Sequence, residues 1–312
     1  MTTLIITHPA CIDHDPGSGH PEAPARLKAV LGGLERWEAE TAVPGAITWV
    51  EAPKAERDTL ILVHGAEHVD RVLQAVPQSG TAYLDPDTGL SPATGNAARR
   101  AAGAVTAAVD AVLGGAARNA FAAVRPPGHH AEPNRAMGFC LFNNVAIGAL
   151  HARKKHGLGR IAVVDFDVHH GNGTEAAFRD DDGLFFASSH QFPHYPGTGS
   201  GRHDSDHILN APLAPGSGSA EFRAAWGERL LPALEQFAPE LILISAGFDA
   251  HRKDPLADIN LVEADFAWVT GEIRAIAESR CAGRLVSTLE GGYDLDALAA
   301  SAVAHVEALA RQ

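Results

Sequence analysis

The chain has 312 residues, of which 46% are hydrophobic and 20% charged, and its formal net charge is -13 at pH 7. This acidic balance argues against a nucleic-acid-binding protein, because phosphate recognition needs clustered lysine and arginine side chains. It permits a cationic substrate, which a negative field attracts, although a purely solubilising role explains the charge equally well.

The sequence carries no signal for a membrane or an oxidising compartment. No apolar run reaches the ~18 residues of a membrane span, and the N-terminal MTTLIITHPA lacks the basic start of a signal peptide. The three cysteines, Cys11, Cys140 and Cys281, form no CxxC pair, so we expect no disulfide framework. We therefore expect a cytoplasmic protein without a membrane partner.

Short, nearly continuous apolar runs recur along the chain, as expected of strands that are buried on both faces. They lie at residues 4–7 (LIIT), 121–124 (FAAV), 161–166 (IAVVDF), 184–187 (LFFA), 241–245 (LILIS) and 285–289 (LVSTL). Amphipathic, alanine-rich stretches predict helices at residues 96–113, 144–155, 220–237, 263–278 and 294–309. The alternation predicts an α/β protein with a mostly parallel sheet flanked by helices. Because no linker or repeat interrupts it, we expect a single domain over residues 1–312.

Polar residues gather where four of these strands end. RPPGHH follows the run at 121–124, DFDVHHGNG the one at 161–166, SAGFDAH the one at 241–245, and EGGYD the one at 285–289. Ligands of open parallel sheets bind at the carboxyl ends of the strands. We therefore expect the four loops to form one site.

Two aspartates and a histidine alternate along the second of these loops. If the segment stays extended, Asp165, Asp167 and His169 face the same side of the chain. Neighbouring carboxylates repel each other unless a cation neutralises them. Together with Asp249 from the SAGFD loop, Asp167 and His169 supply three ligands, which leave a fourth position open as in catalytic zinc sites. The alternative is that Asp167 and His169 only cap the following helix.

Adjacent histidines suit general acid–base chemistry beside a metal. Asp165 and Asn172 are available as partners for His129 and His130; a charged partner keeps an imidazole protonated, whereas a neutral one leaves it closer to neutral. Tyr293 follows two glycines, from where its phenol could donate a hydrogen bond to an oxyanion. A chance surface doublet and a tyrosine packed at a strand end are the alternatives.

Other nucleophiles find little support in the sequence. Cys140 has no general base nearby in the sequence, and no GxSxG motif is present, so a serine or cysteine nucleophile is not expected. Phe139, between Gly138 and Cys140, is either a core residue or a wall of a substrate pocket.

Six motifs together resemble the zinc-dependent histone deacetylase superfamily, in particular its class II and bacterial deacetylase-like amidohydrolases. They are RPPGHHAEP, MGFCLFNN, VDFDVHHGNGT, YPGTG, SAGFDAHRKDPL and EGGYDL. The resemblance extends from HPEAPARL near residue 20 to EGGYDL near residue 295. It implies an arginase-like α/β fold and one catalytic Zn²⁺ bound by Asp167, His169 and Asp249.

The resemblance also implies catalytic roles. His130, paired with Asn172, would be the general base and then the general acid, and His129, paired with Asp165, would assist electrostatically. Tyr293 would polarise the carbonyl of the amide. By the same resemblance, the catalytic residues sit below a narrow tunnel for the acyl-lysine side chain.

Four residues match that tunnel. The carbonyl of Gly138 would accept the substrate amide N–H, and Phe139 would form one wall. Tyr195 stands opposite, where the family commonly has phenylalanine, so its hydroxyl alters the polarity of the tunnel. Leu256 occupies the position at which polyamine-selective relatives carry glutamate, which favours an acyl-lysine substrate.

Monovalent cations are implied as well. A structural K⁺ would lie near Asp165, Asp167, His169, Ser188 and Ser189, bound largely through backbone oxygens. A second monovalent site would involve Phe178, Asp181, Leu184 and His207. Arg26 matches an arginine near an internal exit channel, and Asp85 or Asp87 matches an aspartate at the pocket rim.

We therefore expect a deacylase of acyl-lysine peptides or small acylated amines, with acetylpolyamine hydrolysis as the alternative reaction. An inactive acyl-lysine reader is a further possibility, disfavoured because every metal and acid–base position is filled. A ureohydrolase with two manganese ions would need more ligands, and His170 stands where a second-metal carboxylate is expected. Iron(II) could replace zinc. A homo-oligomer remains open.

Overall fold

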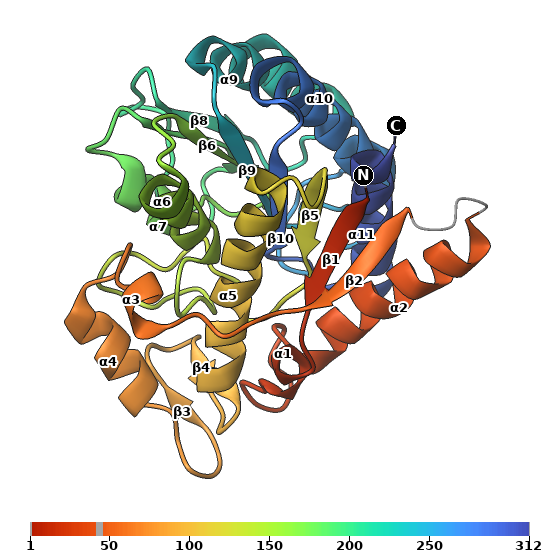
Figure 1. Ribbon diagram of the computed structural model, residues 1–312. Coiled ribbons are helices and arrows are strands. Elements are labelled where there is room, and N and C mark those ends of the chain that lie inside the picture. The colour runs from red at the N-terminus through yellow and green to blue at the C-terminus, as the bar shows by residue number, and fades with distance from the viewer. Residues whose placement is uncertain (1, 42–45, 312) are drawn as a thin grey trace.

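The computed structural model describes residues 2–41 and 46–311 (Figure 1). Its centre is a sheet of eight strands: β1 (Thr3–Thr7), β2 (Ile47–Glu51), β5 (Asn119–Ala122), β6 (Ile161–Asp165), β7 (Leu184–Gln191), β8 (Ile208–Leu213), β9 (Leu241–Ala246) and β10 (Leu285–Leu289). The spatial order is β2-β1-β5-β10-β9-β6-β7-β8, and every neighbouring pair is parallel. A small antiparallel pair, β3 (Ala82–Tyr83) and β4 (Gly89–Leu90), lies apart from this sheet.

Helices cover both faces of the large sheet (Figure 1). On one face, α5 (Thr94–Leu113) packs on β1, β5 and β10, and its neighbour α6 (Asn144–His156) packs on β6 and β9. On the other, α2 (Pro24–Glu40), α11 (Leu295–Ala310) and α10 (Glu263–Cys281) lie side by side in that order. The shorter helices are α1 (Ala10–Asp13), α3 (Arg57–Leu60), α4 (Ala66–Gln74), α7 (Asn172–Phe178), α8 (Ser219–Ala225) and α9 (Leu231–Phe237).

The expected α/β class, with a mostly parallel sheet between helices, is confirmed, and all six predicted strands are present. Every residue of β5, β6, β7, β9 and β10 is buried, which explains their continuous apolar runs. The sequence missed β2 and β8, which form the two edges of the sheet. Both are partly exposed, and β8 contains Pro212, which an edge strand tolerates. The limits of a single domain over 1–312 remain a prediction.

One predicted helix is interrupted. The stretch 220–237 was expected to be continuous, but α8 and α9 are joined by a π-helical turn at Trp226–Leu230. Pro232 lies in the first turn of α9 and has no N–H to donate to the preceding turn. The hydrogen-bond pattern therefore shifts just before the proline, while Trp226 and Leu230 stay buried.

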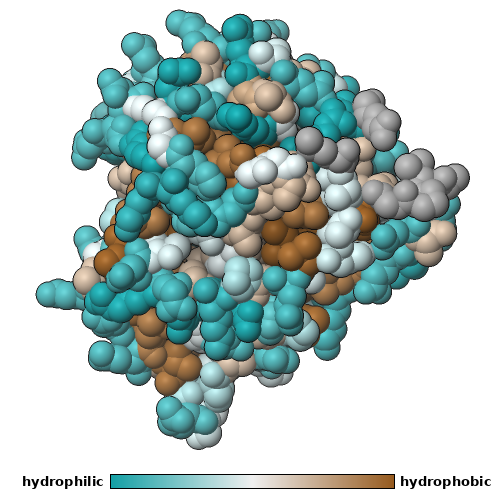
Figure 2. All heavy atoms as spheres, in the orientation of Figure 1, coloured by the Kyte–Doolittle hydropathy of each residue, from teal (hydrophilic) through white to brown (hydrophobic). Residues whose placement is uncertain are grey.

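The larger of two hydrophobic clusters runs from Leu4 to Leu309 and joins the sheet to both helix layers, and a smaller one includes Leu60, Val69 and Phe142. On the outside, the face in Figure 2 is mostly hydrophilic, and its hydrophobic residues form separate patches. Among the described residues, none of the helices combines the length and the apolar character that crossing a membrane requires. Most of the buried apolar side chains therefore lie between the sheet and its two helix layers.

Two glycines within helices allow the packing of α5 to be tested. A Cβ on Gly103 would collide with the backbone of Pro53, whereas a Cβ on Gly271 in α10 would meet nothing within 4 Å. We expect Gly103→Ala to destabilise the fold by about 1–3 kcal/mol through overpacking. The matched Gly271→Ala should stabilise it by about 0.5–1 kcal/mol through helix propensity. Urea unfolding measures both; equal effects of the two substitutions would contradict the close approach at Gly103.

Candidate active site

The four loops expected to converge follow β5, β10, β9 and β6, and these strands are direct neighbours in the middle of the sheet. At their carboxyl ends lies a cavity of about 230 Å³. It is lined by Asp87, Pro127, His129, His130, Gly138, Phe139, His169, His194, Tyr195, Leu256, Gly291 and Tyr293. The fold thus brings the motif residues together around one pocket.

Three side chains at the base of this pocket could hold a metal ion. Asp167, His169 and Asp249 each offer one donor atom, and the three atoms lie within 4.8 Å of one another. His169 Nδ1 is 3.0 Å from Asp167 Oδ1 and 3.2 Å from Asp249 Oδ2. All three residues are buried.

The surroundings of this trio fit a cation. Asp249 Oδ2 is buried yet has no hydrogen bond of acceptable geometry to any described residue. Burial and the neighbouring charge of Asp167 raise the pKa of Asp249, as electrostatic repulsion between two adjacent carboxylates predicts. At Gly291 a Cβ would overlap the space where the two carboxylates meet, so the site requires a residue without a side chain there. The donor set of two carboxylates and one imidazole suits a divalent transition metal.

His129 is held by charge. Its Nδ1 lies 3.0 Å from Asp165 Oδ2, and its Nε2 is 3.8 Å from Asp167 Oδ1. Burial lowers the pKa of His129, but the negative charges of Asp167 and Asp165 outweigh burial and raise the pKa to about 10. The two carboxylates therefore favour the protonated form of His129.

His130 is the opposite case. Its ring lies 4.0 Å from that of His129, and its Nδ1 is 2.8 Å from Asn172 Oδ1. Burial and the positive charge of His129 hold the pKa of His130 well below its usual value. A neutral His130 with Nδ1–H directed at Asn172 keeps the lone pair on Nε2 for accepting a proton.

Tyr293 faces the same pocket from the EGGYD loop. The Arg26 guanidinium lies 4.7 Å from the centre of its ring, and its backbone N–H donates to Asp254 Oδ2 at 2.7 Å. Burial raises the pKa of the phenol well above its usual value, more than Arg26 lowers it. Tyr293 is therefore a neutral hydrogen-bond donor.

Aromatic residues form the upper walls. Gly138 and Phe139 have φ angles of 56° and 66°, and a Cβ on Gly138 would run into the His130 ring. The ring of Tyr195 stands perpendicular to that of His130 at 5.2 Å, and Phe139 lies edge-on to Tyr293 at 6.0 Å. Tyr195 is 37% exposed, so it stands at the mouth of the pocket.

The expected K⁺ residues also lie at this edge. Asp165 pairs in register with Ser188 of β7. The hydroxyls of Ser188 and Ser189 are engaged with His190 and with the Trp226 indole, each at 2.9 Å. The residues of the second expected monovalent site also lie close together. Leu184 N donates to Asp181 O, and Asp181 N donates to Phe178 O. His207 Nε2 lies 3.2 Å from Arg179 O.

His170 does not join the metal trio. Its Nε2 is 2.9 Å from Glu175 Oε2, and its Nδ1 is 2.8 Å from Thr198 Oγ1. Both ring nitrogens are thus engaged away from Asp167 and Asp249. This arrangement gives no support to a two-metal ureohydrolase centre.

Sequence reasoning assigned no role to three residues beside the site. Glu290 accepts hydrogen bonds from the backbone N–H groups of Gly128 and His129 at 2.6 and 3.2 Å, which fixes the histidine loop. His194 stacks on His169 at 5.1 Å, and Glu132 accepts from Asn172 at 2.7 Å. All three residues lie within the quoted motifs or directly beside them, but only the structure shows which side chains they contact.

Of the two rim candidates, Asp87 lines the pocket. Its Oδ1 accepts the backbone N–H of Gly138 at 3.1 Å, so it supports the wall loop. Asp85 instead accepts the backbone N–H groups of Asp87 and Thr88 at 3.1 and 2.7 Å. Asp85 therefore fixes the backbone of the loop that carries Asp87.

Removing one carboxylate tests the metal trio. In metal-free protein, Asp249→Asn should raise the melting temperature, because it relieves the repulsion with Asp167. Free Zn²⁺ at about 100 times the Kd should stabilise the wild type by about 2.7 kcal/mol, and the variant far less. Differential scanning calorimetry measures both, with the exposed Asp180→Asn as control. Equal zinc stabilisation of wild type and Asp249→Asn would contradict the assignment.

The chain is similar to known proteins over most of its length. The family model "Histone deacetylase domain" matches residues 20–309. The chain is 39% identical to histone deacetylase 14, chloroplastic, of Arabidopsis thaliana over 98% of this chain and 76% of that protein. It is 40% identical to the histone deacetylase-like amidohydrolase of Pseudomonas aeruginosa over 88% and 73%.

Among solved structures, the chain is similar to the HDA15 HD domain, with a TM-score of 0.92 at 33% identity, covering 99% of this chain and 88% of that one. The match therefore extends over the whole sheet and both helix layers as well as the site. The chain belongs to the histone deacetylase family of hydrolases.

Proposed function

We propose that the protein is a zinc-dependent deacylase that hydrolyses the side-chain amide of acyl-lysine in peptides or proteins. The observation that carries the proposal is the pair of adjacent histidines with unlike partners, Asp165 for His129 and Asn172 for His130, beside the Asp167–His169–Asp249 trio. Tyr293 faces them across the same cavity. These residues supply a base, a fixed positive charge, a metal site and an oxyanion donor.

The chain's own residues would share the chemistry as follows. Nε2 of His130 takes a proton from the attacking water and later delivers it to the leaving amine. Tyr293 O–H donates a hydrogen bond to the carbonyl oxygen, which becomes negative as water attacks. His129, held by Asp165, stabilises that negative charge without giving up its proton. The amide bond breaks when the amine is protonated, leaving a carboxylate and a free amine.

Zn²⁺ held by Asp167, His169 and Asp249 would supply Lewis acidity and lower the pKa of water at the site. Iron(II) remains the alternative metal. We also propose structural K⁺ at Asp165, Asp167, His169, Ser188 and Ser189. It is supported by the main-chain oxygens of Asp167 and His169, which accept no hydrogen bond from the described residues.

The shape of the pocket supports an apolar stem that ends in an amide. Phe139 and Tyr195 are aromatic walls, and Leu256 adds an apolar side chain. Burial raises the pKa of Tyr195, so its hydroxyl stays neutral. A lysine stem is a chain of methylenes that such walls can bury. The carbonyl of Gly138 would accept the amide N–H of the substrate.

Acetylpolyamine hydrolysis is the second candidate. Asp87 lies on the pocket lining, and the net charge of -13 would attract a cationic substrate. Against it stands Leu256, which offers no charge to a distal ammonium. An oligomer stays open.

The phenol can be tested by removing one atom. Tyr293→Phe should lower kcat by about 10²–10³ and change KM little, because the hydrogen bond strengthens as the oxyanion forms. Steady-state kinetics on an acetyl-lysine peptide measures the loss, with Tyr83→Phe as control because Tyr83 is 58% exposed and away from the pocket. An unchanged kcat would rule out this role.

A substrate panel tests the choice of amine. We expect acetyl-lysine and longer acyl-lysine peptides to be cleaved faster than acetylated polyamines. Activity should vanish with a chelator and return with Zn²⁺. Leu256→Glu should shift the ratio toward polyamines by roughly fivefold, the value of a partly exposed ion pair, and the neutral Leu256→Gln should not. A wild-type preference for polyamines would favour the second candidate.

A further inference from the structure

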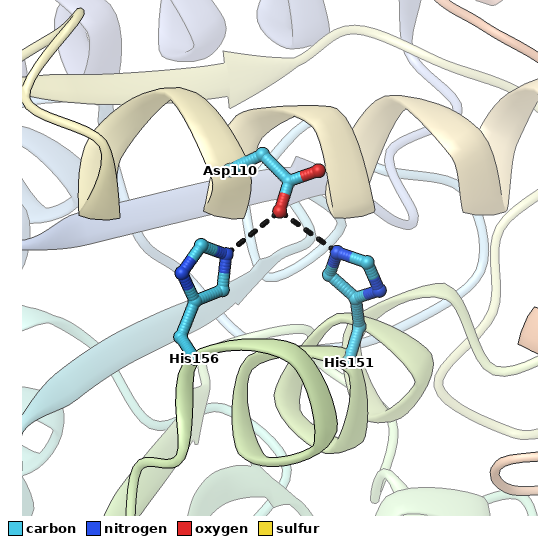
Figure 3. Close-up of side chains that lie close together, drawn as sticks. All are labelled: Asp110, His151 and His156. Atoms are coloured by element: carbon cyan, nitrogen blue, oxygen red, sulfur yellow. Dashed lines mark hydrogen bonds and ion pairs between the residues drawn. The ribbon is translucent and has the colours of Figure 1, made fainter.

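A second cluster of metal-ligating side chains lies outside the pocket. Asp110 comes from α5, and His151 and His156 come from the facing side of α6 (Figure 3). The Nε2 atoms of His151 and His156 lie 2.9 and 2.8 Å from the same oxygen, Asp110 Oδ1. Two imidazoles thus converge on one carboxylate oxygen from either side.

This cluster is remote from the catalytic centre. The cap of α6, Asn143, contacts the backbone of His129 and Ala131, so that end of the helix borders the pocket. His156 is the last residue of α6, 13 residues further on. At 1.5 Å per residue the helix spans about 20 Å. The cluster therefore lies toward the amino ends of the strands, at the end of the sheet opposite the pocket.

The three side chains are fixed in position yet reachable by an ion from solvent. The exposed fractions of their side chains are 17% for His151, 24% for His156 and 34% for Asp110. Burial opposes ionisation of Asp110, but hydrogen bonds from Lys155, His156 and His151 outweigh it and lower the pKa to about 2. Asp110 is therefore an anionic donor at neutral pH.

The donor set and spacing suit a borderline divalent metal. Imidazole nitrogen and carboxylate oxygen are zinc ligands, and all three donor atoms lie within 4.8 Å of one another. Around a tetrahedral ion with bonds of about 2.1 Å, donors are about 3.4 Å apart. The side chains would need to separate only slightly from the carboxylate oxygen to admit the ion.

The competing explanation is an ion-pair staple between two helices. Lys155 Nζ lies 2.7 Å from the other oxygen, Asp110 Oδ2, and 55% of its side chain is exposed. Lysine alone suffices for a staple, and it takes the oxygen that the imidazoles leave free. An ion pair between the helices does not require two Nε2 atoms to converge on the remaining oxygen of Asp110, whereas a metal site does.

We propose that Asp110, His151 and His156 form a second site, which binds a divalent transition-metal ion such as Zn²⁺ or Co²⁺ through two imidazole nitrogens and one carboxylate oxygen. Water completes the coordination. The ion joins α5 to α6, the two helices that pack side by side on one face of the sheet. It is separate from the catalytic metal and takes no part in the hydrolysis.

The test uses the whole protein carrying its first zinc. Equilibrium dialysis against Co²⁺, followed by elemental analysis, should find an additional metal ion per chain. His151→Gln and His156→Gln keep an N–H donor for Asp110 but lose the imidazole. Each should weaken Co²⁺ binding at least about tenfold, since even second-shell changes cost ~10–100-fold. The exposed His203→Gln serves as the matched control and should bind Co²⁺ as the wild type does.

Lys155→Gln separates the site from a staple. Removing a neighbouring positive charge should tighten Co²⁺ binding by roughly fivefold at a metal site. A staple would instead show no extra metal in the wild type and a lower melting temperature in the variant. The proposal is overturned if no additional Co²⁺ binds, or if His151→Gln and His156→Gln bind it as tightly as the wild type. Because binding is measured rather than activity, the result is independent of the proposed deacylase reaction.

Discussion

The burial of four carboxyl groups at the carboxyl ends of neighbouring strands is the constraint around which the site is built. Asp165, Asp167, Asp249 and Glu290 have no exposed surface. Backbone N–H groups compensate part of the charge: Gly291 donates to Asp167, Val168 to Asp249, and Gly128 to Glu290. A buried carboxylate without such partners would be very costly. The loops therefore take conformations that aim their amides inward, and the rest of the imbalance favours a cation at the trio.

The same charge distribution makes two adjacent histidines unlike. His129 faces Asp165 and carries a proton, and that positive charge, together with burial, keeps His130 neutral. Asn172 then orients His130 without charging it, and Glu132 in turn holds Asn172. One electrostatic arrangement thus yields a fixed cation and a free base from the same residue type.

Helix α6 connects this centre to the outside of the molecule. It is capped by Asn143, whose side chain accepts the N–H of Ala146 and contacts the backbone of His129. It ends at His156, in the cluster with Asp110. A metal ion there would stabilise the pairing of α5 and α6 from the far end of the helix, while the strand that follows α6 carries Asp165 at its own end.

By itself, the sequence determined the inner strands, the α/β class and the motifs at the strand ends. Continuous apolar runs and polar clusters are local features, so they could be read without the fold. The sequence did not predict the edge strands β2 and β8, because their partial exposure interrupts the apolar pattern. It also did not predict the break at Trp226–Leu230, because a single proline hardly changes the helical pattern. Only the tertiary structure decided that β5, β10, β9 and β6 are neighbours, that Glu290 supports the histidine loop, and that Asp110 meets His151 and His156. These are contacts between residues far apart in the chain, and their geometry depends on packing that no local spacing encodes.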